Sequence, residues 1–327
     1  MSVIPPAIED VRQLRDRLSR WLVRTPMVRC PALELETGGE VFAKLEFLQQ
    51  TSTFKPRGAL SVILSLDKQQ LRAGVTAVSA GNHAIATAFA AQQAGTSAKV
   101  VMLRAASPLR VARCRDYGAD VVLADDVHSA FELAAEIQQN EGRYLVHPFE
   151  GPLTTLGTAT VGLEICEDVP DFDNLLVPIG GGGLCSGIAS VARQLNPAGA
   201  VFGIEPEGAD SMRRSFEAGS PQRLDRVDTI ADSLGAPFAL PHSYSLCRDH
   251  VDKLVQVSDD ELRAAMRFLF EHMKIAVEAA CAASTAALLG PLAEPVRGRK
   301  TVILLCGSNI DWATYQQQTG IGTDRGI

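Results

Sequence analysis

Residues 51–59 read Thr51-Ser52-Thr53-Phe54-Lys55-Pro56-Arg57-Gly58-Ala59 and follow a run, residues 41–46, that predicts a β-strand. Pro56 suits the first turn of a helix, where its missing N–H is not needed. We therefore expect Lys55 at the positive end of that helix, where a cation is unfavourable. Its amine should then lose a proton readily and act as a Schiff-base nucleophile. On this stretch alone, a surface lysine in an ordinary loop is the alternative.

Downstream of this turn, short apolar strands alternate with helices. Strands are expected at residues 75–79, 99–103 and 120–124, and helices at residues 83–94, 108–117 and 127–139. Such alternation indicates a parallel sheet with helices on both faces. Upstream, residues 7–22 carry an apolar stripe typical of a helix.

A second series follows, with strands at residues 174–179, 200–205 and 301–305 and helices at residues 56–66, 153–167, 184–195, 211–218, 258–272 and 278–289. Residues 220–249 contain three prolines and are expected to be irregular. We predict the α/β class with two doubly wound domains and parallel sheets. The small domain, residues 69–151, is inserted in a large domain formed by residues 1–68 and 152–327.

Composition excludes several classes of protein. The 327 residues carry a formal charge of −7 and are 46% hydrophobic, so a large core is expected and nucleic acid is not an expected partner. Seven scattered cysteines without a Cys-x-x-Cys pair indicate reduced thiols in the cytoplasm. No apolar run approaches about 18 residues, and the N-terminus does not look like a signal peptide, so no membrane association is expected.

The glycine run Gly180-Gly181-Gly182-Gly183 joins a strand to a helix that begins near Leu184. Consecutive glycines let backbone N–H groups converge on an anion, and the helix N-terminus adds partial positive charge. The run predicts a phosphate cradle. Two alternatives stay open: a dinucleotide site with Glu205 as the acidic residue, and a tight structural turn.

Two further turns lie at strand ends. Ser79-Ala80-Gly81-Asn82-His83 opens a helix whose N–H groups can hold a carboxylate, and Asn82 is either a donor to an oxygen or a simple N-cap. Cys306-Gly307-Ser308-Asn309 ends the last strand. Ligands of open α/β sheets bind beyond the carboxyl ends of strands, so one pocket is expected to collect all these groups. An amine, an anion cradle and an amide donor together suit pyridoxal phosphate.

These motifs resemble the fold-type-II pyridoxal-phosphate enzymes, in the threonine/serine dehydratase and serine racemase branch. The similarity runs in order over nearly the whole chain and implies the tryptophan-synthase-β-like fold. It implies pyridoxal 5'-phosphate as the cofactor and Lys55 as the catalytic residue that carries it and moves the substrate's α-proton. The implied cofactor contacts are Phe54, Lys55, Asn82, Gly180, Gly181, Gly182, Gly183, Leu184 and Cys306. The implied substrate contacts are Ser79, Ala80, Gly81, Asn82 and His83.

The chain departs from the family pattern at three places. Ala80 stands where the branch's racemases have a serine that acts on the second face of the substrate. At the family's divalent-metal site Glu205 and Ala209 match, but Ser211 replaces the last carboxylate, so we expect no metal. Glu278-Ala279 stands where Glu-Pro is usual.

We therefore predict a lyase that converts a β-hydroxy-α-amino acid of the L-threonine or L-serine type into a 2-oxo acid and ammonia. Three alternatives stay open: a more specialised substrate (3-hydroxyaspartate, an aryl serine or a catabolic intermediate), an amino-acid racemase, and a non-catalytic binder. The family resemblance also implies a homodimer with a small amino acid as its substrate. His128, His147, His242, His250 and His272 are interpreted as structural, and Asp232-Ser233 either contacts substrate or forms an ordinary turn.

Overall fold

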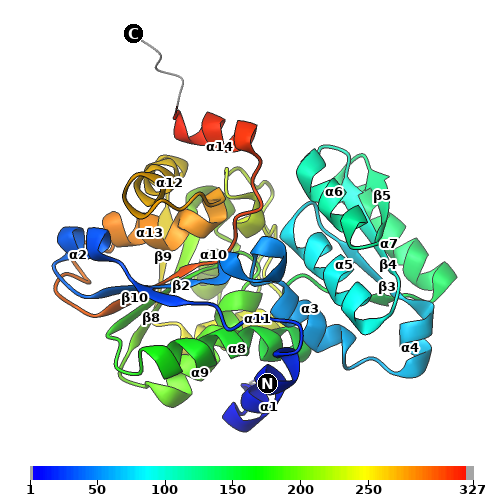
Figure 1. Ribbon diagram of the computed structural model, residues 1–327, viewed down its shortest axis with the longest axis horizontal. Helices are drawn as coiled ribbons and strands as arrows, with labels where there is room; N and C mark the ends of the chain where they lie inside the picture. The colour runs from blue at the N-terminus through cyan, green and yellow to red at the C-terminus, as the bar shows by residue number, and fades with distance from the viewer. Residues whose placement is uncertain (1–2, 322–327) are drawn as a thin grey trace.

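The computed structural model describes residues 3–321 and arranges the strands in two separate sheets (Figure 1). The larger sheet has the strand order β1-β2-β10-β7-β8-β9. Its strands are β1 (Met27–Arg29), β2 (Val41–Leu45), β7 (Asn174–Pro178), β8 (Ala200–Pro206), β9 (Lys253–Val257) and β10 (Thr301–Leu305). Neighbouring strands are parallel except β1 and β2, which run antiparallel.

The smaller sheet has the order β5-β4-β3-β6 and is parallel throughout. Its strands are β3 (Val75–Val78), β4 (Ala98–Leu103), β5 (Asp120–Ala124) and β6 (Tyr144–Leu145). The predicted α/β class with parallel sheets is confirmed. The larger sheet takes strands from both sides of the segment that forms the smaller one, as an inserted unit requires. The domain limits at residues 69 and 151 stay a prediction.

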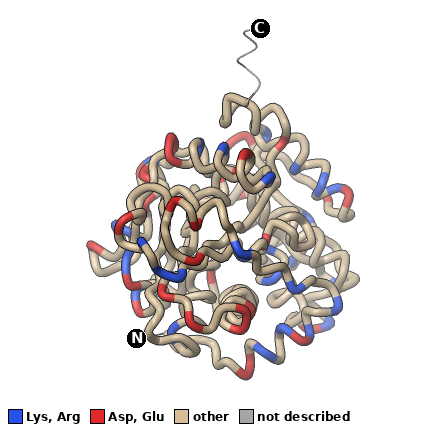
Figure 2. The backbone as a smooth tube through the Cα atoms, turned by 60° about the vertical axis from the view of Figure 1, so that its left-hand side comes forward, with Lys and Arg blue, Asp and Glu red and all other residues tan. Residues whose placement is uncertain are grey.

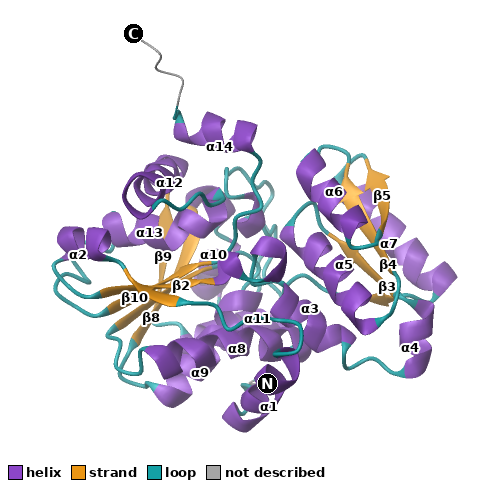
Figure 3. Cartoon of the chain, viewed as in Figure 1, coloured by secondary structure: helices purple, strands orange, loops and turns teal. Residues whose placement is uncertain are grey.

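Helices cover both sheets (Figure 3). Those around the smaller sheet are α4 (Lys68–Ala73), α5 (Asn82–Ala94), α6 (Pro108–Asp116) and α7 (Val127–Glu141). The remaining helices are α1 (Ile8–Leu18), α2 (Pro31–Thr37), α3 (Pro56–Ile63), α8 (Pro152–Asp168), α9 (Gly183–Leu195), α10 (Ser211–Ala218), α11 (Pro241–His250), α12 (Asp259–Met273), α13 (Ala283–Leu289) and α14 (Trp312–Thr319). Helix α3 packs against both α5 and α8, so it joins the two halves of the molecule.

The central strands of the larger sheet position the site. Strand β10 is buried along its whole length, and so is β7, because helices cover both faces. Since β2, β7 and β10 are parallel neighbours, their carboxyl ends lie at one edge of the sheet. These ends lead to Lys55, to the glycine run and to Cys306 respectively. The expected convergence of the three motifs follows from this topology.

The structure differs from the sequence prediction at several elements. Helix α1 ends at Leu18 rather than near residue 22. The elements that were not predicted are β1, β6, β9, α2, α4 and α14. The segment 220–249, expected to be irregular, contains the short 3₁₀ helix η4 (Asp232–Leu234) and most of α11. Helix α11 begins there because Glu150 accepts hydrogen bonds from the backbone N–H groups of His242 and Ser243 at 2.7 and 3.1 Å. This cap comes from a distant segment and leaves no local signal.

The surface does not concentrate charge of one sign. Lys and Arg residues are interspersed with Asp and Glu residues along the chain (Figure 2). Among residues 3–321, no helix combines the length and the apolar character needed to cross a bilayer.

Candidate active site

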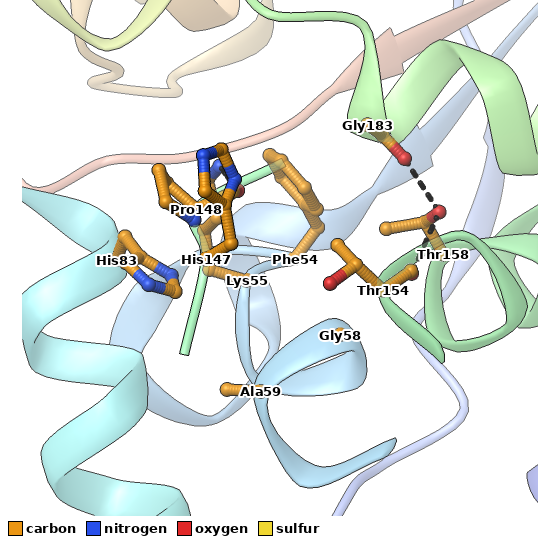
Figure 4. Close-up of a pocket in the computed structure, with 10 residues that line it drawn as sticks. All are labelled: Phe54, Lys55, Gly58, Ala59, His83, His147, Pro148, Thr154, Thr158 and Gly183. Carbon is orange, nitrogen blue, oxygen red and sulfur yellow. Dashed lines mark hydrogen bonds between the residues drawn. The ribbon is translucent and has the colours of Figure 1, made fainter. Parts of the chain in front are cut away.

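Lys55 lies directly before α3, which begins at Pro56 as the sequence predicts. Its Nζ donates a hydrogen bond to the carbonyl oxygen of Pro148 at 2.7 Å and lies 5.1 Å from the centroid of the Phe54 ring. The amine is next to a narrow cavity that brings distant segments together (Figure 4). The cavity is lined by Phe54, Lys55, Gly58, Ala59, His83, His147, Pro148, Thr154, Thr158 and Gly183.

Burial of the amine lowers the pKa of Lys55 to about 8, although the nearby groups of Cys306 and Glu278 act in the opposite direction. The direction agrees with the sequence prediction, but the main cause is different. The sequence argument relied on the helix N-terminus, whereas desolvation is the larger effect in the folded protein. With a pKa near 8, about a tenth of the amine is neutral at pH 7, against less than about one part in a thousand for an ordinary lysine.

This pKa predicts how fast the cofactor-free protein captures pyridoxal phosphate. Only the neutral amine attacks an aldehyde, so the capture rate should rise as pH increases from 7 through 8 and level off above about pH 9. Stopped-flow absorbance measures the rate. Pyridoxine phosphate, which has no aldehyde, is the matched control, and its binding should show no such rise. A capture rate that still grows about tenfold between pH 8 and pH 9, as it would for a lysine of ordinary pKa, would contradict the lowered pKa.

A buried group of charges holds the start of α3. The Arg57 guanidinium donates to both carboxylate oxygens of Glu46 and to both of Glu164, at 2.8–2.9 Å. Lys44, which is fully buried, pairs with Glu164 at 2.7 Å. Buried charges are stable only when each one is paired, as these are. The network ties α3 to β2 and α8 and so fixes the backbone that carries Lys55.

The glycine run leaves no room for side chains. Gly182 has φ of 90°, in the left-handed region that favours glycine, and no side chain caps the N-terminus of α9. A Cβ built on Gly181 would overlap the ring of Phe149, and a Cβ built on Gly183 would overlap the backbone of Phe149. The uncapped helix N-terminus leaves backbone N–H groups for an anion. Close packing against Phe149 and Leu234 also accounts for the glycines, so the tight-turn alternative stays open beside the phosphate cradle.

Cys306 lies near Lys55, and Asn82 is linked to the same region through Glu278. The carbonyl oxygen of Cys306 accepts a hydrogen bond from the Phe54 N–H at 3.2 Å. Asn82 Nδ2 donates to Glu278 Oε1, and Asn82 Oδ1 accepts from Asn309 Nδ2, both at 2.7 Å. Helix α5 begins at Asn82 and its N-cap is Gly81, so the N-cap interpretation of Asn82 is wrong. The amide instead belongs to a buried polar network.

The pKa values of the Cys306 and Glu278 side chains are both raised in the folded protein. A hydrogen bond with Cys281, together with burial, raises the pKa of the Cys306 thiol well above its ordinary value, so the thiol stays neutral. Burial also raises the pKa of Glu278.

In the loop of residues 79–83, the side chains of Ser79 and His83 are already hydrogen-bonded, whereas no side chain caps the backbone N–H groups at the start of α5. The Ser79 hydroxyl accepts the Gly81 N–H at 3.1 Å, so it is already engaged within the loop. Ala80 faces a separate cleft. The His83 ring makes a 2.7 Å hydrogen bond through Nε2 with the Val146 carbonyl, and burial lowers the pKa of His83 to about 3. No side chain caps α5, so the backbone N–H groups at the helix start are not used by a capping side chain.

His147 lines the cavity with Lys55, although the sequence interpretation treated it as structural. Its Nδ1 accepts the backbone N–H groups of Phe149 and Glu150 at 3.3 and 2.9 Å. Burial lowers the pKa of His147 to about 4, so the ring is neutral and carries its proton on Nε2. Its position just after β6, at the carboxyl end of a parallel strand, was the signal that sequence reasoning passed over.

Glu205, near the carboxyl end of β8, contacts the start of α10. Its two oxygens accept the backbone N–H groups of Met212 and Arg213 at 2.8 Å each, at the start of α10. Burial raises the pKa of Glu205 to about 8. This geometry disfavours the dinucleotide alternative, because the carboxylate already caps a helix. Among residues 3–321 no cluster of three His, Cys, Asp or Glu side chains is arranged to hold a metal ion.

A cleft of about 610 Å³ opens beside Ala80. One wall comes from the segment 103–110, after β4 and in α6, and the other from Ile230, Asp232, Glu278 and the segment 309–318. About half of the lining residues are apolar, among them Leu103, Ala105, Ala106, Ile230, Ala279 and Ile310. The charged lining residues are Arg110, Asp232, Glu278 and Asp311. Sequence reasoning did not find Arg110, because a basic residue in an amphipathic helix gives no functional signal.

Comparison with known proteins identifies several relatives. Residues 18–307 match the family profile described as pyridoxal-phosphate dependent enzyme. The chain is 51% identical to phenylserine dehydratase of Ralstonia pickettii, and the match covers 97% of each chain. It is 38% identical to the catabolic L-threonine dehydratase TdcB of Escherichia coli, again over 97% of each chain. The structure of maize serine racemase superposes with a TM-score of 0.91 at 34% identity, over 97% of this chain and 98% of the other.

Proposed function

The chain belongs to the pyridoxal-phosphate dependent enzymes, and on that premise we propose that it removes water and then ammonia from a β-hydroxy-α-amino acid whose β-substituent is large and uncharged. The products are a 2-oxo acid and ammonia. The enzyme is a lyase that depends on pyridoxal 5'-phosphate. The observation that carries the finer proposal is the cleft of about 610 Å³ that is lined by Ala80 of the predicted substrate loop and by several apolar residues.

The residues present fit the cofactor. The Lys55 amine and Gly183 of the uncapped glycine loop line one cavity, and Asn82 and Cys306 adjoin it through Gly307. An uncapped helix N-terminus suits a phosphate, and a buried amine of lowered pKa suits an aldehyde. The cavity measures only about 10 Å³, so side chains that line it, such as Phe54, must shift to admit a ring.

Each group then has a defined task. When bound, the cofactor supplies an electron sink for negative charge at the substrate's α-carbon. Backbone N–H groups of Gly180–Gly183 and Leu184 hold its phosphate, and those of residues 79–83 hold the substrate's carboxylate. Lys55 Nζ, neutral at a useful fraction near pH 7, takes the α-proton. The Cys306 thiol stays neutral, so the site places no anion at the position predicted to face the pyridine nitrogen.

The charge of the cleft bears on substrate choice. Three carboxyl groups, those of Asp232, Glu278 and Asp311, line it against the single guanidinium of Arg110. A substrate with a second carboxylate, such as 3-hydroxyaspartate, would meet like charges there. The volume lies in the range of small-molecule pockets, and the apolar wall suits an aryl group. These features, with the similarity to a phenylserine dehydratase, favour an aryl serine over the smaller or charged candidates.

A substrate panel tests this proposal. With L-serine, L-threonine, β-phenylserine and 3-hydroxyaspartate, we expect kcat/KM for 2-oxo acid release to be highest for β-phenylserine, by at least about tenfold over L-serine. The reason is apolar burial of the ring in the cleft. A lactate-dehydrogenase-type coupled assay or derivatisation of the 2-oxo acid measures release. Preference for 3-hydroxyaspartate would contradict the substrate proposal.

The same reaction mixtures distinguish dehydration from racemisation. A racemase needs a proton donor on the face opposite Lys55, and the methyl group of Ala80 supplies none. Chiral chromatography should therefore show little D-serine beside the pyruvate formed from L-serine. D-serine at a rate comparable to pyruvate would favour the racemase, and absence of any 2-oxo acid would favour a non-catalytic binder.

We also propose that the protein is a cytoplasmic homodimer. All seven cysteines are free and buried, which supports a reducing compartment. Several large apolar side chains are exposed, among them Leu35 at 87% and Trp312 at 66%, which leaves apolar surface for a second copy. Light scattering would measure the mass in solution.

A further inference from the structure

Arg110 joins the two halves of the molecule across the cleft. It lies in α6, beside the smaller sheet, and is buried. Its Nε donates to the carbonyl oxygen of Asn309 at 2.9 Å, after β10 of the larger sheet. Nη1 and Nη2 both donate to the carboxylate of Asp232 in η4. One side chain therefore connects α6 to two separate loops of the larger half.

The partners of Arg110 lead directly to the predicted cofactor contact Asn82. Asn309 donates from Nδ2 to Asn82 Oδ1, and Glu278 accepts from Asn82 Nδ2. Glu278 also lies 3.7 Å from Arg110 Nη2 and accepts the Asn309 backbone N–H at 3.2 Å. Arg110 is therefore connected to Asn82 through one intermediate residue, Asn309 or Glu278. A second contact, from Ser107 to Asp311 at 3.2 Å, joins the same end of α6 to the start of α14.

Arg110 also faces the loop proposed to hold the substrate's carboxylate. A Cβ built on Gly81 would lie 3.1 Å from Arg110 Nη1, so the guanidinium is in contact with this loop. Asn309 and Asp232 use three of the five N–H groups of the guanidinium. One N–H on each Nη is left, and these two point to opposite sides of the guanidinium, so a carboxylate on this loop gains the paired Nη1 and Nη2 donors by exchange with Asp232.

We propose that Arg110 is a positioning residue that couples binding of the substrate's α-carboxylate to closure of α6 over the cleft, an inference that rests on the proposed function for the identity of the ligand. Asp232 is the exchangeable partner, because 58% of its side chain is exposed while Arg110 is buried. A carboxylate on the loop of residues 79–83 supplies the guanidinium with a further anion. This carboxylate replaces Asp232 as the partner of the guanidinium while the contact to Asn309 remains, and α6 stays closed during the reaction.

Hydrogen exchange on the cofactor-loaded protein tests the coupling without turnover. L-phenylalanine has the amine and carboxylate but no β-hydroxyl to lose, and 2-phenylethylamine is its counterpart without a carboxylate. We expect L-phenylalanine to slow amide exchange in residues 108–116 of the unmodified protein and 2-phenylethylamine to leave it unchanged. In Arg110→Gln, neither ligand should slow amide exchange in residues 108–116. Arg113→Gln, at an exposed position of the same helix, is the matched control and should behave like the unmodified protein.

Kinetics give the second readout. Loss of charge-assisted hydrogen bonds should raise KM for β-hydroxy amino acids about 10- to 100-fold in Arg110→Gln, with a smaller effect on kcat. Arg110→Lys keeps the positive charge but loses the paired N–H donors of the guanidinium. Its KM should therefore lie between those of the unmodified protein and Arg110→Gln. Ligand-induced protection of α6 that survives in Arg110→Gln, or an unchanged KM, would overturn the coupling.

The two proposals fail in different ways. If no β-hydroxy amino acid is dehydrated but L-phenylalanine still protects α6 only when Arg110 is present, the proposed function is wrong and the coupling stands. If Arg110→Gln does not fold, Asp232→Asn replaces it, because Asp232 is exposed. Without ligand, the amide hydrogens of α6 should exchange faster in that variant. A rate equal to that of the unmodified protein would overturn the proposed coupling.

Discussion

Replacement of Lys55 by alanine is expected to reduce the rate of 2-oxo acid formation by at least about a thousandfold. The variant loses both the amine that captures the cofactor and the base that takes the α-proton, and no other lysine is among the residues that line the cavity with it. The visible absorbance of the lysine-bound cofactor should disappear as well. Enzyme assay and absorbance spectra of the same preparation measure the two effects.

Labelling gives an independent check on the lysine. Borohydride reduction of the cofactor-loaded protein, followed by peptide mapping, should place the cofactor on Lys55. Lys253→Ala, at an exposed strand position, is the matched control and should keep both activity and absorbance. A label on another lysine would refute the assignment of Lys55.

Replacement of Gly181 by aspartate is expected to weaken cofactor binding by at least about a hundredfold. A Cβ at this position already overlaps the Phe149 ring, so the loop must deform to hold any side chain. The carboxylate then repels the phosphate that the loop is proposed to bind. Loss of two charge-assisted hydrogen bonds alone accounts for a change of this size. Fluorescence titration of the cofactor-free variant with pyridoxal phosphate measures the affinity.

The control for this variant makes the same change elsewhere. Gly142 ends α7 with φ of 67° and has open space around it. Aspartate tolerates that conformation better than most residues, so Gly142→Asp should keep the fold and the cofactor. Circular dichroism confirms that both variants fold. If Gly181→Asp retains the cofactor through dialysis, the glycine run is not the phosphate cradle.

The local motifs were predictable because each depends on neighbouring residues. Pro56 sets the start of α3, the glycines permit the turn before α9, and alternating apolar segments define parallel strands. Since parallel strands end at one edge, the sequence also predicted that Lys55 and the glycine run approach each other. The structure places both at one cavity. The roles assigned to these residues remain predictions that the experiments above address.

The sequence by itself thus determined the fold class, the cofactor family and the residues around Lys55. Only the tertiary structure decided which groups surround them: Arg110 with Asp232 and Asn309, Glu278 with Asn82, and His147 beside Lys55. More than 100 residues of chain separate Arg110 from each of its two partners, and also Asn82 from Glu278. The physical reason is that such contacts and the burial they produce depend on how the two sheets pack. Periodicity and turn residues report the local backbone, whereas the lowered pKa of Lys55 arises mainly from burial that distant segments create.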